Sequence, residues 1–331
     1  MKQIIDVHTH LYPEDYLTAL ARRSEPPFVH HEADGGRTFR IFPDDEGRPV
    51  TEAYWSVDAK VAFMDEHGIS VSIVSLGNPW LDPFRGEEAI ALARTVNSWF
   101  AGLAASTDGR VLGMGCLPSA AAVDDIVPVI REIAATDGLY GVMTGTRMAG
   151  LPFDADELDP VWRALAETRL PVLVHPHYGV GVEEMGGYGH ALPLAMGFPY
   201  ETALALTRLS MSGVLARHPE LRIIGSHGGG VLPFLAGRLD GCWAPDEAAR
   251  KRHDLPPSQG LGSLYLDALV YHPRAIRAVV DLVGSDHVMF GTDHPFEIAD
   301  PQANLTALRE AVPAAEQDRV LSGTASTLFA L

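Results

Sequence analysis

Positive charge is scarce in this sequence. Its 331 residues include 25 lysines and arginines against 43 aspartates and glutamates, which gives a formal net charge of −18 at pH 7. Proteins that bind nucleic acid or an anionic membrane surface need clustered basic residues to neutralise phosphate. The charge balance therefore argues against both partners, whereas a small anionic substrate stays compatible if arginines gather locally at its site.

Cysteine and long apolar runs are also lacking. The only cysteines, Cys116 and Cys242, are too few for a disulfide framework, as is usual in a reducing compartment. We find no apolar stretch long enough to cross a bilayer and no signal sequence before the first apolar run. Hydrophobic residues still make up 47% of the chain, enough for a sizeable core. We therefore expect a soluble cytoplasmic protein.

Short apolar runs rich in β-branched residues alternate with segments of helical periodicity. The eight predicted strands are residues 3–8, 71–76, 111–117, 140–144, 172–175, 222–227, 263–269 and 288–292. The predicted helices include residues 87–105, 123–135, 160–168, 202–212 and 274–283. A strand followed by a helix, repeated eight times, predicts the α/β class and a (β/α)8 TIM barrel. One barrel accounts for residues 1–331 as a single domain.

Two connections are longer than the loops that usually join a strand to the following helix in a barrel. Residues 11–56 follow the first predicted strand, and residues 178–200 follow the fifth. Connections of this length inside a compact domain are usually functional lids or small subdomains. Active sites of such barrels lie at the C-terminal ends of the strands, where both connections begin. We therefore predict that residues 11–56 form an inserted lid or small subdomain and that both connections border the active site.

Metal-ligating residue types occur at the predicted strand ends. His8 and His10 are two residues apart, so an extended strand directs both side chains to one face. His175 and Asp293 end or follow the fifth and eighth strands. Neutral imidazoles and carboxylates are suitable ligands for Zn²⁺, and a catalytic zinc keeps one position open. The pattern predicts one metal ion bound by these four residues.

Each predicted ligand also has another interpretation. His8 and His10 could be hydrogen-bonded surface histidines, because short histidine pairs occur by chance. His177 could take the place of His175 as the ligand. Asp293 could instead cap the helix that follows it.

Lysine is rare in this sequence, and the positions of the few lysines bear on the number of metal ions. Several hydrolases built on metal-binding barrels use a carbamylated lysine at the end of the fourth strand to bridge two metals. Lys2, Lys60 and Lys251 are the only lysines, and none is near the fourth predicted strand. A mononuclear site is therefore favoured.

His227 ends the sixth predicted strand and precedes three consecutive glycines. Its imidazole can change charge near neutral pH, which proton transfer requires. We therefore interpret His227 as a general acid/base beside the metal. The alternatives are an additional metal ligand or a residue that supports a ligand through a hydrogen bond.

The motifs taken in order resemble the amidohydrolase superfamily. They are His8-Thr-His10, His175 before a proline, His227 in Ser-His-Gly-Gly-Gly, and Asp293 in Gly-Thr-Asp-His-Pro-Phe. Within the superfamily they are most similar to the decarboxylase branch typified by 2-amino-3-carboxymuconate 6-semialdehyde decarboxylase. The resemblance spans nearly the whole chain.

Two residues depart from the pattern of that branch. His177 occupies a position where the pattern has tryptophan, and His294 one where it often has tyrosine. Both residues are expected to border the pocket, so the departures bear on which substrate is bound.

The resemblance also implies roles for two arginines. Arg48, on the first insertion, matches an arginine that binds a substrate carboxylate. Arg238 matches an arginine contributed to the active site of the neighbouring subunit, which implies a homodimer. Taken alone, either residue would be read as a solvated surface group, but a guanidinium can clamp a carboxylate with two hydrogen bonds.

Together these features predict a metal-dependent, non-oxidative decarboxylase of a small unsaturated or aromatic carboxylic acid. One divalent cation, Zn²⁺ or alternatively Mn²⁺, would stabilise the negative charge of the transition state. His227 would transfer the proton, and Asp293 would belong to the catalytic groups as well as to the ligands. No organic cofactor is required. The same centre also suits a hydrolase or hydratase, and a non-catalytic ligand-binding barrel would need the open metal position blocked by protein.

Overall fold

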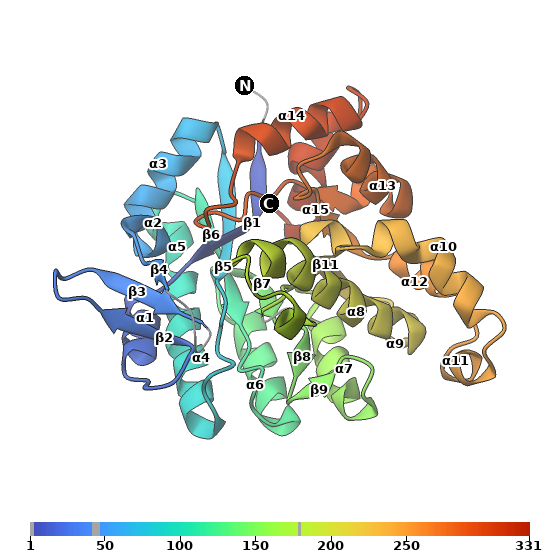
Figure 1. The fold of residues 1–331 in the computed structure, drawn as a ribbon, viewed down its shortest axis with the longest axis horizontal. Helices are drawn as coiled ribbons and strands as arrows, with labels where there is room; N and C mark the ends of the chain where they lie inside the picture. Colours follow the sequence, from blue (N-terminus) through green and yellow to red (C-terminus); the bar gives the residue numbers. More distant parts are fainter. Residues whose placement is uncertain (1–2, 42–46, 178–179) are drawn as a thin grey trace.

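Eight parallel strands form the centre of the molecule (Figure 1) in the computed structural model, which describes residues 3–41, 47–177 and 180–331. They follow one another around the sheet as β1 (Ile5–Leu11), β5 (Val71–Leu76), β6 (Val111–Cys116), β7 (Leu139–Thr144), β10 (Pro171–Val174), β11 (Arg222–Gly225), β12 (Tyr265–Asp267) and β13 (Val288–Met289). The Val7 N–H donates to Phe290 O at 3.0 Å, which joins the first strand to the segment after the last. The prediction of a (β/α)8 barrel is confirmed.

Helices alternate with these strands and surround them (Figure 1). They are α3 (Val57–His67), α4 (Gly86–Ala101), α5 (Leu103–Ser106), α6 (Val123–Ala134), α7 (Asp159–Thr168), α8 (Phe198–Met211), α9 (Val214–Arg217), α10 (Leu232–Trp243), α11 (Glu247–Arg252), α12 (Pro257–Leu261), α13 (Pro273–Val283), α14 (Pro301–Ala311) and α15 (Thr324–Phe329). In α6 the residues Ile126, Val129, Ile130 and Ile133 are buried, as an amphipathic helix against a sheet requires. The predicted helix 87–105 is in fact two helices, α4 and α5, which part at Gly102.

Several predicted strand ends are wrong by a few residues. The first strand continues beyond residue 8 to Leu11, so His8 and His10 lie inside β1, where His10 pairs with Ser75 of β5. The last strand ends at Met289 instead of residue 292. Apolar runs mark which residues face the core, but hydrogen-bond pairing with the neighbouring strand decides where a strand ends.

Short elements complete the barrel. Beside the rim, β8 (Arg147–Met148) pairs with β9 (Leu151–Pro152), and the short helices η1 (Asp156–Leu158), η4 (His227–Gly229), η5 (Ser285–His287) and η6 (Arg319–Gly323) join larger elements. No helix in the described ranges is long and apolar enough to span a membrane.

The first long connection folds as a small antiparallel sheet. It contains α1 (Glu14–Ala21), the three strands β2 (Phe28–His31), β3 (Arg37–Arg40) and β4 (Arg48–Pro49), and α2 (Glu52–Trp55). Phe39 of β3 is buried, and its ring centroid lies 6.1 Å from that of Tyr12, which directly follows β1. The sheet is therefore packed on the end of the strand that carries His8 and His10.

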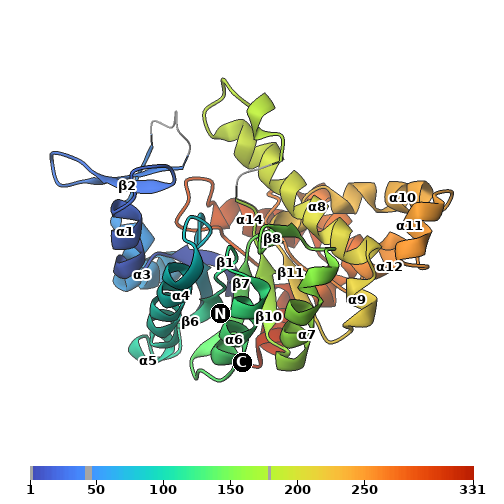
Figure 2. The ribbon, with the colours of Figure 1, turned by 90° about the horizontal axis from the view of Figure 1, so that it is seen from below.

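The second long connection stands on the same side of the barrel. Its described part holds η2 (Val182–Glu184) and η3 (Pro193–Gly197) before α8 begins, and residues 178–179 lie outside the described residues. Figure 2 shows the β2–β3 sheet and this yellow-green segment projecting together, on the side opposite to both chain termini. The two connections thus flank one end of the barrel.

We predict that truncating Leu206 lowers the free energy of unfolding by about 2–5 kcal/mol, the usual cost of a Leu→Ala change in a core. Leu206 on α8 is fully buried, and a Cβ built on Gly225 of β11 would lie only 2.6 Å from its Cδ1. Chemical denaturation of Leu206→Ala measures the change. Leu255→Ala, at a residue 44% exposed, is the control and should stay within about 0.5 kcal/mol of the parent.

Candidate metal centre and active site

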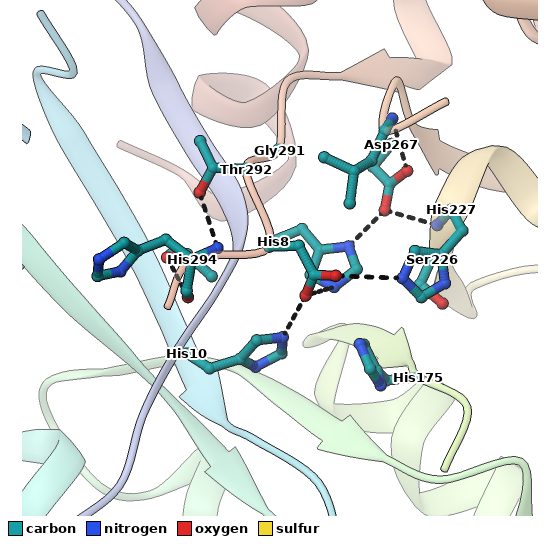
Figure 3. Close-up of polar contacts among 12 residues, drawn as sticks. His8, His10, His175, Ser226, His227, Asp267, Gly291, Thr292 and His294 are labelled. Atoms are coloured by element: carbon teal, nitrogen blue, oxygen red, sulfur yellow. Dashed lines mark hydrogen bonds and ion pairs between the residues drawn. The ribbon is translucent and has the colours of Figure 1, made fainter. Parts of the chain in front are cut away.

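Four side chains converge at the C-terminal mouth of the barrel and form a buried metal site. His8, His10, His175 and Asp293 each offer one ligand atom, and these atoms all lie within 4.8 Å of one another. Figure 3 shows the three imidazoles facing one another, and their ring centroids are 4.9–5.2 Å apart. The structure thus brings together four residues separated by up to 285 positions in the chain.

Hydrogen bonds fix which nitrogen of two imidazoles faces the centre. His8 Nδ1 lies 2.6 Å from Asp267 Oδ2, and His175 Nδ1 lies 2.8 Å from Pro176 O. Because an imidazole that donates from Nδ1 carries its lone pair on Nε2, both Nε2 atoms can ligate a cation. Among the described residues neither buried Nε2 has a hydrogen-bond partner, and His8 Nε2 has only an ion-pair contact with Asp293 Oδ1. A metal ion bound between these side chains would satisfy both ring nitrogens.

The carboxylate of Asp293 completes the set. Its Oδ1 lies 3.2 Å from His10 Nε2 and 3.4 Å from His8 Nε2. His10 Nδ1 is held from behind by Ser75 Oγ at 3.1 Å. Three imidazole nitrogens and one carboxylate oxygen match the donor types of catalytic Zn²⁺ sites, and the same set suits Mn²⁺. The residues present therefore fit one divalent cation.

The electrostatics of the site also favour a cation. Burial would raise the pKa of Asp293, but His8, His10 and His227 outweigh it and hold that pKa well below its ordinary value. Burial would likewise lower the pKa of His8, yet Asp293 and Asp267 raise it to about 10. Without a metal, a proton on His8 thus supplies the positive charge that stabilises the carboxylates of Asp293 and Asp267.

The other two imidazoles stay neutral, which is the form that binds metal. Burial is the main cause that lowers the pKa of His10 to about 4, and the charge on His8 lowers it further. Burial also holds the pKa of His175 well below its ordinary value, assisted by the neighbouring histidines.

Asp267 supports this centre and was missed in the sequence. It ends β12, and besides its contact with His8 it accepts hydrogen bonds from the backbone N–H groups of His227, Gly228 and Leu269 at 2.9, 2.8 and 3.0 Å. One carboxylate thus orients a ligand and anchors the loop that carries His227. A lone aspartate within the seventh apolar run was the available signal, because an unpaired buried carboxylate is costly.

His227 lies beside the ligands, at the start of η4. Its Nε2 is 3.6 Å from Asp293 Oδ2, and its side chain is 14% exposed, so it reaches both the metal site and the pocket. Its φ of +53° is unusual for a residue with a side chain, and such strain is often found at functional sites. Gly230 allows the tight turn that follows, because a Cβ there would lie 1.9 Å from Pro199 O.

A cavity of about 110 Å³ opens over the centre. His175, His227 and Asp293 form its floor, and its walls comprise Arg48, Asn78, His190, Leu194, Phe198, Phe296, Glu297 and Ile298. The Arg48 guanidinium carbon lies 5.5 Å from the centroid of the Phe296 ring, a cation–π geometry. Both long connections therefore border the pocket, the first through Arg48 and the second through His190 and Leu194.

Three sequence-based interpretations are wrong. His177 and His294 were expected to border the pocket, but both are buried and neither lines it. His177 instead contacts the Trp80 ring at 4.9 Å between centroids, and its N–H donates to Glu201 Oε1. The alternative that Asp293 caps a helix also fails, because Asp300 caps α14 by accepting from the Ala303 N–H at 2.9 Å.

Arg238 lies apart from this site. It is exposed on α10 and does not line the cavity of its own chain. Of the twelve residues of α10 only Leu232 is buried, and Phe234 is 89% exposed. One face of α10 thus lacks a partner within the part of the chain that the structure describes.

We predict that His175→Ala strips the metal from a folded barrel, because one of the four ligands is lost. Metal content of the purified variant, measured by plasma mass spectrometry beside circular dichroism, tests this. His218→Ala is a suitable control, since His218 directly follows α9 and lies outside the metal cluster. Full occupancy in folded His175→Ala would contradict the assignment.

Comparison with known proteins agrees with the resemblance seen in the sequence. A family model described as Amidohydrolase matches residues 5–331. The 2-amino-3-carboxymuconate-6-semialdehyde decarboxylase of Dictyostelium discoideum is 26% identical over 302 residues, covering 89% of this chain and 82% of that protein. The 6-methylsalicylic acid decarboxylase of Penicillium expansum is 28% identical over 345 residues, covering 98% of this chain and 95% of that protein.

A solved structure extends the similarity to three dimensions. The crystal structure of Metarhizium anisopliae IDCase in apo form superposes with a TM-score of 0.92 at 34% identity, covering 99% of this chain and 97% of that one. The family model reaches from the first strand to the last residue, and this chain therefore belongs to the amidohydrolase family.

Proposed function

We propose that the protein is a metal-dependent, non-oxidative decarboxylase that releases CO₂ from a small unsaturated or aromatic carboxylic acid. The observation that carries this proposal is a buried three-histidine, one-aspartate site whose cavity also contains the Arg48 guanidinium and the imidazoles of His190 and His227. Relatives with decarboxylase names, similar along most of the chain, support the reaction class. The enzyme is a carboxy-lyase.

The reaction sets two requirements for the pocket. The bond between the carboxyl carbon and the substrate carbon breaks, CO₂ leaves, and the substrate carbon keeps the electron pair until it accepts a proton. A divalent cation bound by the four ligands would stabilise the negative charge that develops on the substrate. The side chains of the cavity must then hold the substrate and deliver the proton.

His227 is placed to deliver that proton. Its ring lines the cavity, with Nε2 toward Asp293, and its buried Nδ1 has no hydrogen-bond partner. His227 donates the proton to the carbon that CO₂ leaves, and Asp293 orients it while also serving as a ligand.

Arg48 is placed to hold the substrate. It comes from β4 of the inserted sheet, is half-buried, and reaches the cavity over the Phe296 ring. Arg48 lines the cavity, where its guanidinium can donate hydrogen bonds to a bound anion. A carboxylate or an acidic substrate oxygen is the group that a guanidinium recognises best. The inserted sheet acts as a lid that carries this arginine.

Zn²⁺ is the cation that we propose, with Mn²⁺ as the second choice. Neutral imidazole nitrogens dominate the donor set, which favours zinc over the harder, oxygen-preferring cations. The two are told apart by metal analysis of protein purified without added metal, followed by chelation and reconstitution with each ion.

We further propose that the protein is a homodimer in which Arg238 reaches the neighbouring active site. Arg238 is exposed, and the apolar Phe234 beside it is almost fully so. Since only Leu232 of α10 is buried among the described residues, the rest of this helix is available to pack against a second subunit. A twofold dimer would bury the same face of α10 from both subunits.

The test of the reaction is CO₂ release from a panel of unsaturated and phenolic carboxylic acids. We expect release that depends on a divalent cation and stops after chelation. Matching esters, amides and lactones form the second arm of the panel, because a hydrolase or hydratase would act on those instead. Turnover confined to the second arm would contradict decarboxylation while leaving the metal site intact.

His227→Ala should retain its metal yet lose activity by about 10²–10⁴-fold, the usual contribution of general acid/base catalysis. Metal content and the initial rate of CO₂ release are measured on the same preparation. Unchanged activity would contradict the assignment of the proton donor. Loss of the metal to the extent seen for His175→Ala would instead make His227 a fifth ligand.

A mixture of Arg238→Ala and His227→Ala proteins should regain activity that neither parent has. If Arg238 serves the neighbouring site, a mixed dimer assembles one site in which both residues are intact. Subunit exchange is verified independently with differently tagged chains. Verified exchange without recovered activity, or full activity of a monomer at assay concentration, would reject the shared site.

A further inference from the structure

Lys60 is a fully buried cation behind the metal site. It lies on α3 and is the only lysine or arginine among the described residues that is buried. Lysine is seldom fully buried, because removing its ammonium group from water is costly unless it is paired. Burial lowers the pKa of Lys60 to about 7, although the carboxylates of Asp6 and Asp293 oppose the change. This interior lysine does not line the cavity, so the mechanism above does not use it.

The Lys60 ammonium group joins two segments that carry metal ligands. Its Nζ donates to Thr9 Oγ1 at 2.6 Å and to His294 Nδ1 at 2.5 Å. Thr9 stands between the first two ligands, and His294 directly follows the fourth. Burial and the charge on Lys60 lower the pKa of His294 to about 2, so this imidazole is neutral and can accept the hydrogen bond.

Further contacts tie the same two segments together. Thr9 Oγ1 donates to His294 O at 3.0 Å, and the His10 N–H donates to the same oxygen at 2.7 Å. The His294 ring stacks on Phe63, with 3.8 Å between ring centroids. Lys60 and Phe63 are three residues apart on α3, so one face of this helix holds His294 at two points. Figure 3 shows the His294 ring pointing away from the three ligand imidazoles.

Asp6 forms the other half of the buried cluster. It is fully buried and accepts hydrogen bonds from the Thr292 N–H at 3.1 Å, from Thr292 Oγ1 at 2.7 Å and from the His8 N–H at 3.2 Å. With Asp267 and Asp293 it makes three buried carboxylates around the centre. Asp6 thus ties the start of β1 to Thr292, which directly precedes the ligand Asp293.

We propose that Lys60 is a positioning residue of the metal centre. From α3 it ties the strand that carries His8 and His10 to the loop that carries Asp293. It acts through Thr9 and His294 and touches neither substrate nor metal. The inference rests on the proposed metal site and adds a residue on which that site depends.

The test is the metal affinity of the Lys60→Met variant, because the methionine side chain is similar in length to lysine but carries no charge. Zn²⁺ affinity is measured by competition with a chromophoric chelator, and the visible absorption of the Co²⁺-loaded protein reports the ligand geometry. We expect affinity about 10–100-fold weaker, the usual effect of losing a group that supports metal ligands, and a changed Co²⁺ spectrum. The control is Lys251→Met, at an exposed lysine paired with Glu247, which should match the parent in both measurements.

Thr9→Val is the second variant and keeps the test valid if Lys60→Met does not fold. It preserves side-chain shape and removes the hydroxyl through which Lys60 reaches His294 O. We expect about 10-fold weaker Zn²⁺ binding. A folded Lys60→Met/Thr9→Val double variant should bind little more weakly than Lys60→Met, because residues of one network are not additive.

The outcomes separate this inference from the proposed function. If the parent binds metal, and the folded Lys60→Met and Thr9→Val variants bind it with unchanged affinity and an unchanged Co²⁺ spectrum, Lys60 has only a structural role and the inference is overturned. Lower thermal stability of these variants, without weaker metal binding, does not support the inference. If the parent binds neither Zn²⁺ nor Mn²⁺, the proposed function fails first, and this inference fails with it.

Discussion

The burial of Asp293 among three imidazoles is the constraint on which the rest of the site depends. Asp293 is only 6% exposed, so its carboxylate loses most of its hydration, and a nearby positive charge is needed to offset the free-energy cost. The site provides this positive charge in two ways. Without metal, His8 holds a proton at a pKa of about 10, whereas a divalent cation would displace that proton and take over its charge. The same negative pocket therefore selects a cation and keeps its ligands in place.

Closing the barrel and assembling the site are one structural event. The carbonyl of His8 accepts hydrogen bonds from the backbone N–H groups of Thr292 and Asp293 at 3.1 and 2.8 Å. These bonds join the first strand to the segment after the last, and they set the distance between the first and fourth ligands. Asp293 adopts a φ of +60° to make this turn, a strained conformation that the surrounding hydrogen bonds stabilise. Anything that loosens this junction should weaken the metal site before it unfolds the barrel.

The sequence was informative where chemistry follows from local pattern. Apolar runs predicted all eight strands, and a histidine pair spaced by two predicted a shared face for His8 and His10. It was less informative where tertiary contacts decide. The eighth strand stops at Met289 because pairing ends there, not because the apolar run ends. Lys60 is 51 residues from Thr9 and 234 from His294, and no periodicity reveals that the helix carrying it directs an ammonium group between them. His177 and His294 were misplaced for the same reason, since a position next to a ligand in sequence can face away from the pocket.

A crystal structure of the active, Zn²⁺-loaded protein would show whether one catalytic cation is bound by His8, His10, His175 and Asp293. Data collected on both sides of the zinc absorption edge locate the ion without reference to the protein. We expect a single anomalous peak about 2.0–2.2 Å from the Nε2 atoms of His8, His10 and His175 and from one Asp293 oxygen, the distances usual for zinc. A peak bound by other residues, or no peak in crystals of protein that still releases CO₂, would contradict this assignment.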